Sequence, residues 1–350
     1  MTRVVSHKDT RHKDTKILSS LFTFHGLRLI LRYFLVSALR PLCSAHKATL
    51  PIIVLLSALF LSGCQESELY REKMVLMGTF VEVISPDTRA PAIVFNEIKR
   101  VESIFSKYKA DSQVALLNHN GRIAPSKELF FVAEKARKFW EDSGGAFDVT
   151  IGPLMDAWGF TEKEYIRPPD AKISEALLKV GLDKVDIKSN LIYFKVAGMK
   201  VDFGAIAKGY AVDRAVKELK NAGINSCLIN AGGDIYCLGK KFGRPWRVAV
   251  NNPRRSGYIE YLNIEDKAVV TSGDYENFFI NNGKRFSHIF NPKTGYPADS
   301  GVVSVTVVAD DCLTADALAT SIFVLGRKEG LELAKKYNSG RVIIISKDDV

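Results

Sequence analysis

The chain is organised around residues 201–213, which read VDFGAIAKGYAVD. The apolar Val201 is followed by the carboxylate of Asp202, Gly204 permits a tight turn, and small residues then begin a helix with Lys208 in its first turns. Backbone N–H groups at a helix start, together with a nearby ammonium, favour an anion. The stretch therefore predicts a phosphate-binding site, with an ordinary strand-to-helix connection and a surface lysine as the alternative.

Helices and strands are mixed irregularly on both sides of this stretch. Helices are predicted at 90–108, 126–143, 204–221, 315–325 and 327–337. Strands are predicted at 77–84, 185–187, 192–194, 227–230, 246–250, 259–264, 268–271, 286–290, 302–308 and 342–345. Because these elements follow no regular βαβ order, the sequence predicts an α+β fold with mixed or antiparallel sheets and packed helices.

The first 64 residues have the properties of a leader. They carry nine Lys or Arg against two Asp, and so supply seven of the formal net charge of +10. The basic charge of the whole chain therefore gives no reason to expect a nucleic-acid partner. Lys47 precedes an apolar run over 50–61 that is short for a transmembrane span and typical of a signal peptide.

The apolar run ends in Leu61-Ser62-Gly63-Cys64, which resembles the bacterial lipobox. This resemblance implies that Cys64 is lipidated and becomes the first residue of the mature protein. We therefore expect a leader over 1–64, a linker over 65–75 and a folded domain over 76–350. The expected location is the periplasmic side, lipid-anchored to the bacterial cell membrane, with a hydrophobic hairpin or an uncleaved anchor as the alternative.

Two loop segments offer side chains for ligand binding or proton transfer. Phe147 and Asp148 lie in the glycine-flanked GAFDVTIGPL, where an exposed aromatic beside a carboxylate would suit a planar ring with hydroxyls. The alternative is a buried Phe147 with Asp148 as a helix cap. In TSGDYE, residues 271–276, Asp274 is a candidate base, or else part of a turn with an Asx cap.

Two further segments suggest a base and a metal site. His288, in SHIFNPKTGYP, stands at a predicted strand beside a turn rich in proline and glycine, and is the better candidate for a base near neutral pH. The alternative is a packed histidine without a chemical role. Asp316 and Thr320, in ADALAT, share a helix face at i,i+4 and suit magnesium. Alternatively, Asp316 favours the helix dipole and Thr320 is bonded to the backbone.

Six motifs occur in order along the chain: MGT, GAFDVTIGPL, DFGAIAKGYAVD, NAGGD, SHIFNPKTG and ADALAT. As an ordered set behind a lipobox, they resemble the FAD:protein FMN transferase family, also called the ApbE or thiamine-biosynthesis lipoprotein family, from about Met77 to the C-terminus. The resemblance implies FAD contacts from Met77, Tyr108, Ala146, Phe147, Asp148, Asp202, Lys208, His288 and Ile289. It implies magnesium ligation by the Ala205 carbonyl, Asp316 and Thr320. Asn291 stands where many relatives carry Asp before the proline, which weakens a role for a carboxylate there.

The resemblance also implies a reaction, in which FMN is transferred from FAD to a threonine or serine hydroxyl of a target protein with magnesium, releasing AMP. His288, or failing it Asp274, would take the proton from the hydroxyl. The implied acceptors are flavoprotein subunits such as those of the sodium-translocating NADH:quinone reductase or Rnf complexes. The alternatives are an FAD pyrophosphatase that gives FMN and AMP, and a non-catalytic periplasmic flavin-binding lipoprotein.

Overall fold

The computed structural model describes residues 68–337 and 339–349, so the leader and Cys64 lie outside the described residues. The helices are α3 (Ala90–Phe105), α4 (Gln113–Asn120), α5 (Lys127–Asp142), α6 (Gly152–Ala157), α7 (Asp170–Leu177), α8 (Gly204–Asn221), α9 (Cys312–Leu325) and α10 (Arg327–Lys336). Within this part of the chain, none of the helices is long and apolar enough to cross a membrane.

The strands form one large sheet and three small ones. They are β1 (Tyr70–Leu76), β2 (Thr79–Ser85), β3 (Arg122–Ile123), β4 (Val185–Lys188), β5 (Leu191–Phe194), β6 (Cys227–Ala231), β7 (Asp234–Leu238), β8 (Trp246–Asn251), β9 (Tyr258–Ile264), β10 (Lys267–Gly273), β11 (Phe278–Asn281), β12 (Lys284–Ser287), β13 (Val302–Ala309) and β14 (Val342–Ser346). The large sheet has the order β1-β2-β6-β7-β10-β13-β14, and each neighbouring pair is antiparallel. The predicted α+β class is confirmed.

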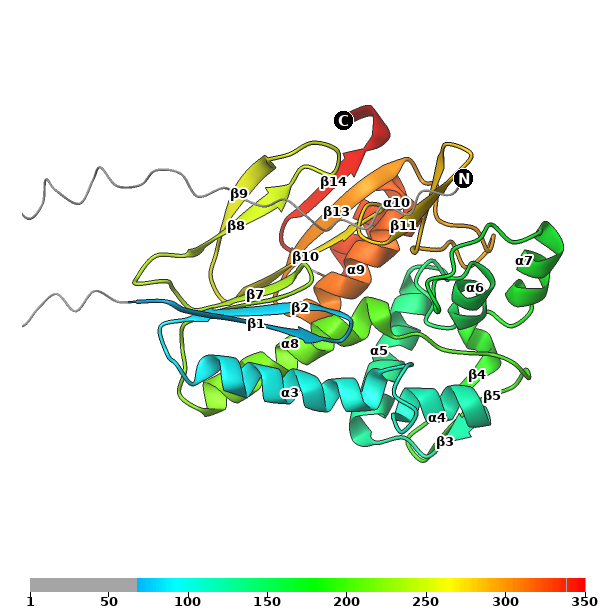
Figure 1. The fold of residues 1–350 in the computed structure, drawn as a ribbon, viewed down its shortest axis with the longest axis horizontal. Coiled ribbons are helices and arrows are strands. Elements are labelled where there is room, and N and C mark those ends of the chain that lie inside the picture. The colour runs from blue at the N-terminus through cyan, green and yellow to red at the C-terminus, as the bar shows by residue number, and fades with distance from the viewer. Residues whose placement is uncertain (1–67, 338, 350) are drawn as a thin grey trace, which may run out of the picture. The chain divides into compact units, whose positions relative to one another are not determined.

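The large sheet is covered on both faces, as Figure 1 shows. Helices α3, α8 and α9 pack on one face in the main core, and the β8–β9 ribbon covers the other face around Trp246 and Leu262. Strand β13 is buried along its whole length, which explains its nearly continuous apolar sequence. A separate aromatic cluster around Trp158 joins α6 and α7 to the β11–β12 hairpin.

Several elements begin or end at other residues than expected, and two of these differences stand out. Strand β1 occupies 70–76 and so covers residues 70–75 of the expected linker over 65–75, which means that the sheet begins before residue 76. Its residues are exposed except for Leu76, and such an edge strand has no apolar alternation to reveal it. Strand β12 ends at Ser287, so His288 and Ile289 follow the strand instead of lying within the predicted strand 286–290. A loop at this point leaves His288 to face a cavity.

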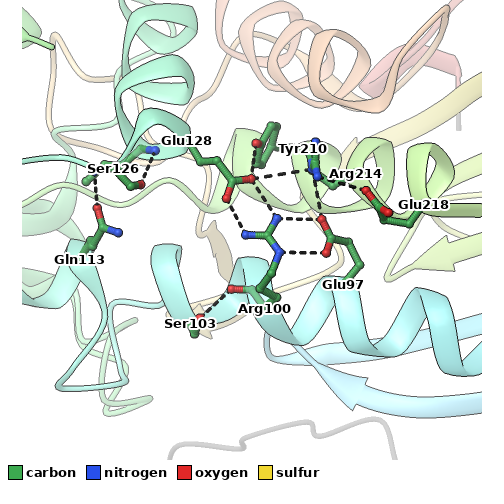
Figure 2. Close-up of polar contacts among 10 residues, drawn as sticks. Glu97, Arg100, Ser103, Gln113, Ser126, Glu128, Tyr210, Arg214 and Glu218 are labelled. Carbon is green, nitrogen blue, oxygen red and sulfur yellow. Dashed lines mark hydrogen bonds and ion pairs between the residues drawn. The ribbon is translucent and has the colours of Figure 1, made fainter. Parts of the chain in front are cut away.

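Helix α8 is fixed to α3 and α5 by a network of charged side chains (Figure 2). Arg100 on α3 donates to Glu97 over 2.7 Å and to Glu128 on α5 over 2.9 Å. From α8, Tyr210 donates to Glu128 over 2.6 Å and Arg214 donates to Glu97 over 3.1 Å. The Arg100 guanidinium lowers the pKa of both glutamates. Such shared ion pairs hold the helix that carries Lys208 in one place.

Candidate active site

A cavity lies where the beginning of α8 meets α9, one end of β7 and of β10, the loop at 146–151, the first turn of α6 and the loop at 288–292. Its polar lining residues are Asp148, Asp202, Lys208, Asp234, Thr271, Ser272, Glu276, His288, Asp316 and Thr320. Ala146, Phe147, Ala205 and Ile289 line it as well. Ten of the residues predicted from the sequence for FAD, magnesium or proton transfer are therefore brought together from segments that lie far apart in the chain.

The close approach of α8 to α9 depends on Gly209. A Cβ atom at this position would lie 2.4 Å from the carbonyl oxygen of Cys312, at the first residue of α9. The side chain of Asp213, one turn further along α8, accepts hydrogen bonds from the N–H groups of Cys312 and Leu313 over 2.7 and 2.9 Å. The stretch 201–213 therefore places Lys208 against α9, because Gly209 has no side chain to hold the helices apart and the Asp213 carboxylate caps the start of α9.

Lys208 lies among carboxylates in this cavity. Its Nζ is 3.3 Å from Oδ2 of Asp316 and 3.4 Å from Oδ2 of Asp234, and it donates to the Gly204 carbonyl over 3.0 Å. Burial opposes the charge on Lys208, but Asp234 and Asp316 outweigh burial and raise its pKa. The ammonium is therefore held in its charged form, as contact with a phosphate would require.

The cavity holds more carboxyl groups than Lys208 alone can stabilise in their ionised form. Burial, reinforced by Asp316, raises the pKa of Asp234 well above its ordinary value. Oδ2 of Asp234 is buried and makes no hydrogen bond within the described residues, although it lies in ion-pair range of Lys208. Burial also raises the pKa of Glu276 to about 7. A further cation bound beside Lys208 would lower these pKa values and stabilise the ionised carboxylates.

The donor atoms in this region suit magnesium. Asp316 and Thr320 both line the cavity from α9, and the Thr320 hydroxyl lies 3.3 Å from that of Ser272. No group of three or more His, Cys, Asp or Glu side chains in the described part of the chain is arranged to bind a metal. A site here would therefore need hydroxyl or backbone oxygens, such as the Ala205 carbonyl, in addition to the carboxylate. Hard oxygen ligands of this kind fit Mg²⁺, and the Asp234 Oδ2, which accepts no hydrogen bond in the described part of the chain, is a further oxygen ligand of this type.

Asp202 lies two residues before α8, and both of its carboxylate oxygens accept hydrogen bonds. One oxygen accepts from the Gly204 N–H over 2.8 Å, and the other accepts from Nζ of Lys107 over 2.7 Å. Burial works against ionisation of Asp202, but Lys107 outweighs it and keeps the pKa below its ordinary value. The predicted FAD residue Asp202 is therefore an anion whose position depends on Lys107.

His288 lines the cavity as a neutral imidazole. Burial lowers its pKa to about 4, so the ring carries no charge near pH 7. Its Nδ1 lies 3.1 Å from the carbonyl oxygen of Asn277. Since a carbonyl can only accept, a hydrogen bond here places the proton on Nδ1 and leaves Nε2 free to accept a proton. A neutral His288 with a free Nε2 is suited to accept a proton, and less suited to bind a phosphate through a positive charge.

Phe147 and Asp148 take part in the packing of the loop. Phe147 is 2% exposed and packs against Phe139, so the exposed aromatic expected here is not found. Asp148 accepts from the Thr150 N–H over 2.7 Å, from its hydroxyl over 2.6 Å, and from the Leu182 N–H over 3.2 Å. The buried alternative is confirmed for Phe147, but Asp148 does not cap α6, whose N-cap is Ile151 without a side-chain hydrogen bond; the contact of both residues with FAD stays a prediction.

Three predicted residues do not line the cavity. At about 190 Å³ it is smaller than the about 300–1,000 Å³ of typical ligand pockets, so a dinucleotide would extend beyond it. Met77 lies in the β1–β2 turn, and Tyr108 is 66% exposed. Their contact with the part of FAD outside the cavity stays a prediction. Asp274 instead forms ion pairs with Arg254 and Arg285, which occupy the carboxylate that was expected to act as a base.

Three residues of the site were not singled out from the sequence. Asp234 lies in the NAGGD motif, and Glu276 lies two residues beyond Asp274 in TSGDYE. Spacing could not decide which carboxylate of TSGDYE faces the cavity, because the chain leaves β10 at Gly273. Lys107 belongs to none of the six motifs, and its partner Asp202 lies 95 positions away in the sequence. Its only sequence clue was its position beside Tyr108.

A family model described as the ApbE family matches residues 77–344. The chain belongs to the ApbE family. Among its curated relatives, the FAD:protein FMN transferase of Haemophilus influenzae is 32% identical over 321 residues, which cover 85% of this chain and 93% of the relative. The corresponding protein of Treponema pallidum is 34% identical over 278 residues, or 73% and 76% of the two chains.

Solved structures of ApbE proteins have the same fold. The ApbE protein of Thermotoga maritima superposes with a TM-score of 0.75 at 34% identity, covering 81% of this chain and 96% of that one. The flavin transferase ApbE from Vibrio cholerae gives a TM-score of 0.73 at 31% identity, covering 80% and 94%. The family resemblance and the prediction of a flavin transferase enzyme are therefore confirmed.

Proposed function

We propose that this ApbE protein transfers FMN from FAD to a threonine or serine hydroxyl of an acceptor protein, with magnesium, and releases AMP. The single observation that carries the proposal is the placement of Lys208 between Asp316 and Asp234 in one cavity with His288. A fixed ammonium and a surplus of carboxylates suit a pyrophosphate bound with a divalent cation, and a neutral imidazole suits removal of a hydroxyl proton.

Lys208, His288 and Asp202 have separate roles in this reaction. Lys208 binds the pyrophosphate oxygens and stabilises the charge that develops on them. Nε2 of His288 takes the proton of the acceptor hydroxyl, whose oxygen forms a bond to the FMN-side phosphorus. The bond from that phosphorus to the bridging oxygen breaks, and the electron pair leaves with AMP. Asp202, held by Lys107, orients the FAD at the start of α8.

Magnesium would be held by Asp316, Thr320 and the Ala205 carbonyl, and when bound it would draw charge from the phosphoryl oxygens. The proposal extends to Met77, Tyr108, Ala146, Phe147, Asp148 and Ile289 as further FAD contacts. Glu276 is the carboxylate we assign to the cavity in place of Asp274, because Glu276 lines it and Asp274 is paired with arginines.

We also propose where the enzyme works. Lipidation at Cys64 would anchor the enzyme on the periplasmic side of the bacterial cell membrane. Acceptors there would be exported flavoproteins, such as subunits of the sodium-translocating NADH:quinone reductase or Rnf complexes. Globomycin, an inhibitor of lipoprotein signal peptidase, tests the anchor: accumulation of the unprocessed precursor is expected, and unchanged processing of the chain would contradict lipidation.

One incubation separates the possible activities. The protein is mixed with FAD, magnesium and a threonine-bearing acceptor protein, and the acceptor is examined by in-gel flavin fluorescence and mass spectrometry. Transfer predicts acceptor that gains the mass of FMN less water, together with one equivalent of AMP. Release of free FMN and AMP without labelling would indicate an FAD pyrophosphatase, and unchanged FAD would indicate a flavin-binding protein. An acceptor with alanine in place of its threonine is the control.

A further inference from the structure

The turn between β7 and β8 presents an aromatic side chain to solvent. Residues 239–245 read GKKFGRP. Lys241 and Arg244 exchange two backbone hydrogen bonds, at 2.8 and 3.0 Å, so Phe242 and Gly243 form a two-residue loop between them. Phe242 is 45% exposed, and all residues from 240 to 245 are exposed. The loop therefore holds a large apolar side chain half in water.

The backbone conformation of this loop does not favour a phenylalanine. The φ angles of Phe242 and Gly243 are 49° and 80°, both in the left-handed region. Two-residue loops of this kind favour asparagine, aspartate or glycine, and a bulky side chain at positive φ is an outlier. The β11–β12 hairpin has the same loop at Asn282 and Gly283, with φ angles of 49° and 75° and the favoured asparagine. Because backbone outliers cluster at functional positions, Phe242 needs a reason beyond forming the turn.

Two basic side chains flank Phe242 without acidic partners. Lys241 and Arg244 are both exposed, and neither forms an ion pair with another residue in the described part of the chain. An exposed aromatic between such side chains is typical of segments that bind an anionic lipid surface. The ring enters the headgroup region, and the cations meet the lipid phosphates.

The carboxylates next to the turn are already engaged. Glu265 lies 3.5 Å from the ammonium of Lys240. Asp266 accepts a hydrogen bond from the Gly239 N–H over 2.9 Å. The positive charge on either side of Phe242 is therefore left available to an external anionic surface.

Hydrogen bonds join this turn to the place where the chain enters the large sheet. Tyr70, the first residue of β1, is paired with Ser85 of β2. The Ser85 hydroxyl donates to the Ser226 carbonyl over 2.7 Å, and the Ser226 hydroxyl donates to the Lys240 carbonyl, also over 2.7 Å. The start of β1, at the left of Figure 1, and the turn therefore lie at the same end of the sheet.

A lipid on Cys64 would bring this end of the sheet to a membrane. Leu69, directly before β1, packs against the cluster that contains Trp246, directly after the turn. Leu69 lies five positions after Cys64. Since an extended chain spans at most about 3.6 Å per residue, Leu69 would remain within about 18 Å of a lipidated Cys64. A tether this short leaves the end of the sheet that carries Phe242 next to the lipid surface.

The active-site cavity lies at the opposite end of the same strands. Asp234, which lines the cavity, is the first residue of β7, whereas the turn follows Leu238, the last residue of β7. On β10, Lys267 pairs with Cys237 next to the turn, and Ser272 lines the cavity five residues later. Contact between the turn and a membrane would therefore leave the cavity at the far end of the sheet.

We propose that the turn at 239–245 docks on the anionic lipid surface of the membrane, with Phe242 in the headgroup region and Lys241 and Arg244 on lipid phosphates. The inference rests on the lipidation of Cys64 in the proposed function. One ring and two cations bind a membrane only weakly on their own, but the short tether makes this contact intramolecular and so favours it. The docked domain presents its active-site cavity away from the lipid, so acceptors are modified at hydroxyls that stand clear of the membrane surface.

A fluorescent label on the turn tests whether it meets lipid. The full-length protein is produced with its leader, the lipid on Cys64 is verified by mass spectrometry, and the protein is reconstituted into vesicles of phosphatidylethanolamine and phosphatidylglycerol. Phe242→Cys is then labelled with the fluorophore NBD, because the three cysteines of the described domain are buried. Asn282→Cys, in the matching loop of the β11–β12 hairpin, is the control. We expect emission at shorter wavelength and quenching by spin-labelled lipids for Phe242→Cys, and neither for Asn282→Cys.

Removal of the two cations should weaken docking. Near an anionic surface each basic residue contributes about a fivefold factor to binding, so adding Lys241→Gln/Arg244→Gln should lower the ratio of docked to undocked protein about 25-fold, and the quenching with it. The control Lys163→Gln/Lys172→Gln also removes two exposed cations, one before α7 and one within it, and should leave the quenching unchanged. Vesicles of phosphatidylcholine alone should reproduce the loss without any charge substitution.

Several results would overturn the inference. Equal, water-like emission at positions 242 and 282 in the lipidated protein would do so, as would quenching that survives Lys241→Gln/Arg244→Gln. A shift to shorter wavelength without quenching by spin-labelled lipids would place the turn on a protein, a second copy of this chain included, and would also contradict docking on lipid. Absence of lipid on Cys64 would refute the anchor and the docking together. FMN transfer is assayed separately in detergent, so failure of docking is distinguished from failure of the transferase.

Discussion

Replacing Gly209 by alanine tests the contact on which the active site is built. The added Cβ would lie 2.4 Å from the Cys312 carbonyl oxygen and 2.8 Å from the Leu313 nitrogen, both of them backbone atoms at the start of α9. Since ordinary contacts lie near about 3.5 Å, α9 must move by about 1 Å relative to α8. Overpacking of this kind costs about 1–3 kcal/mol of the free energy of unfolding.

The same movement separates Lys208 from Asp316, which lie 3.3 Å apart. A misplacement of about 1 Å in a catalytic arrangement can cost about 10²-fold in rate, so we expect a loss of that size in FMN transfer. Urea denaturation measures the stability change, and a steady-state transfer assay measures the rate. The rate should fall even at a temperature where the variant is fully folded.

Gly330→Ala is the matched control for this experiment. Its Cβ would lie 2.6 Å from the Ile322 side chain, so it also crowds α9, but from α10 and away from the cavity. We expect a similar loss of stability of about 1–3 kcal/mol with transfer reduced by less than about threefold. If Gly209→Ala keeps the parent stability and rate, or if both variants lose activity equally, the role assigned to the α8–α9 contact is refuted.

Three further changes test the site. Asp316→Ala should abolish FMN transfer, with a loss of at least about 10²-fold in kcat; undiminished flavinylation with magnesium would contradict the metal assignment. Lys107→Met leaves the Asp202 carboxylate unpaired and should cost about 1–3 kcal/mol of stability and raise the KM for FAD, whereas Lys107→Arg should preserve both. The pKa of His288 lies near 4 in the folded chain, below the ordinary 6.5. Between these two values the unfolded chain binds the proton more readily than the folded chain does. The free energy of unfolding should therefore fall as the pH drops from about 6.5 towards 4. Thermal melts across this range should be flatter for His288→Gln, and an unchanged slope would show that the ring is not shielded.

Local sequence patterns predicted much of the fold. The helix at 204–221 and the hairpin over β4 and β5 were predicted close to their observed positions, because apolar periodicity and turn residues act over a few residues. Strand β1 escaped prediction because its residues are almost all exposed and pair only with β2. Edge strands of this kind are held by a neighbouring strand and have no hydrophobic pattern of their own.

The residues of the candidate site were likewise predicted only in part from the sequence. The sequence by itself placed Lys208, Asp316, Thr320 and His288 in ordered motifs, since each motif is a short run of residues with its own chemistry. Only the tertiary structure decided that Asp274 pairs with arginines while Glu276 faces the cavity, and that Lys107 holds Asp202. The direction in which a side chain points after a strand ends, and the partner it meets far along the chain, depend on how the elements pack. The stretch 201–213 therefore determined its own helix, but the approach of α9 to Gly209 determined what Lys208 contacts.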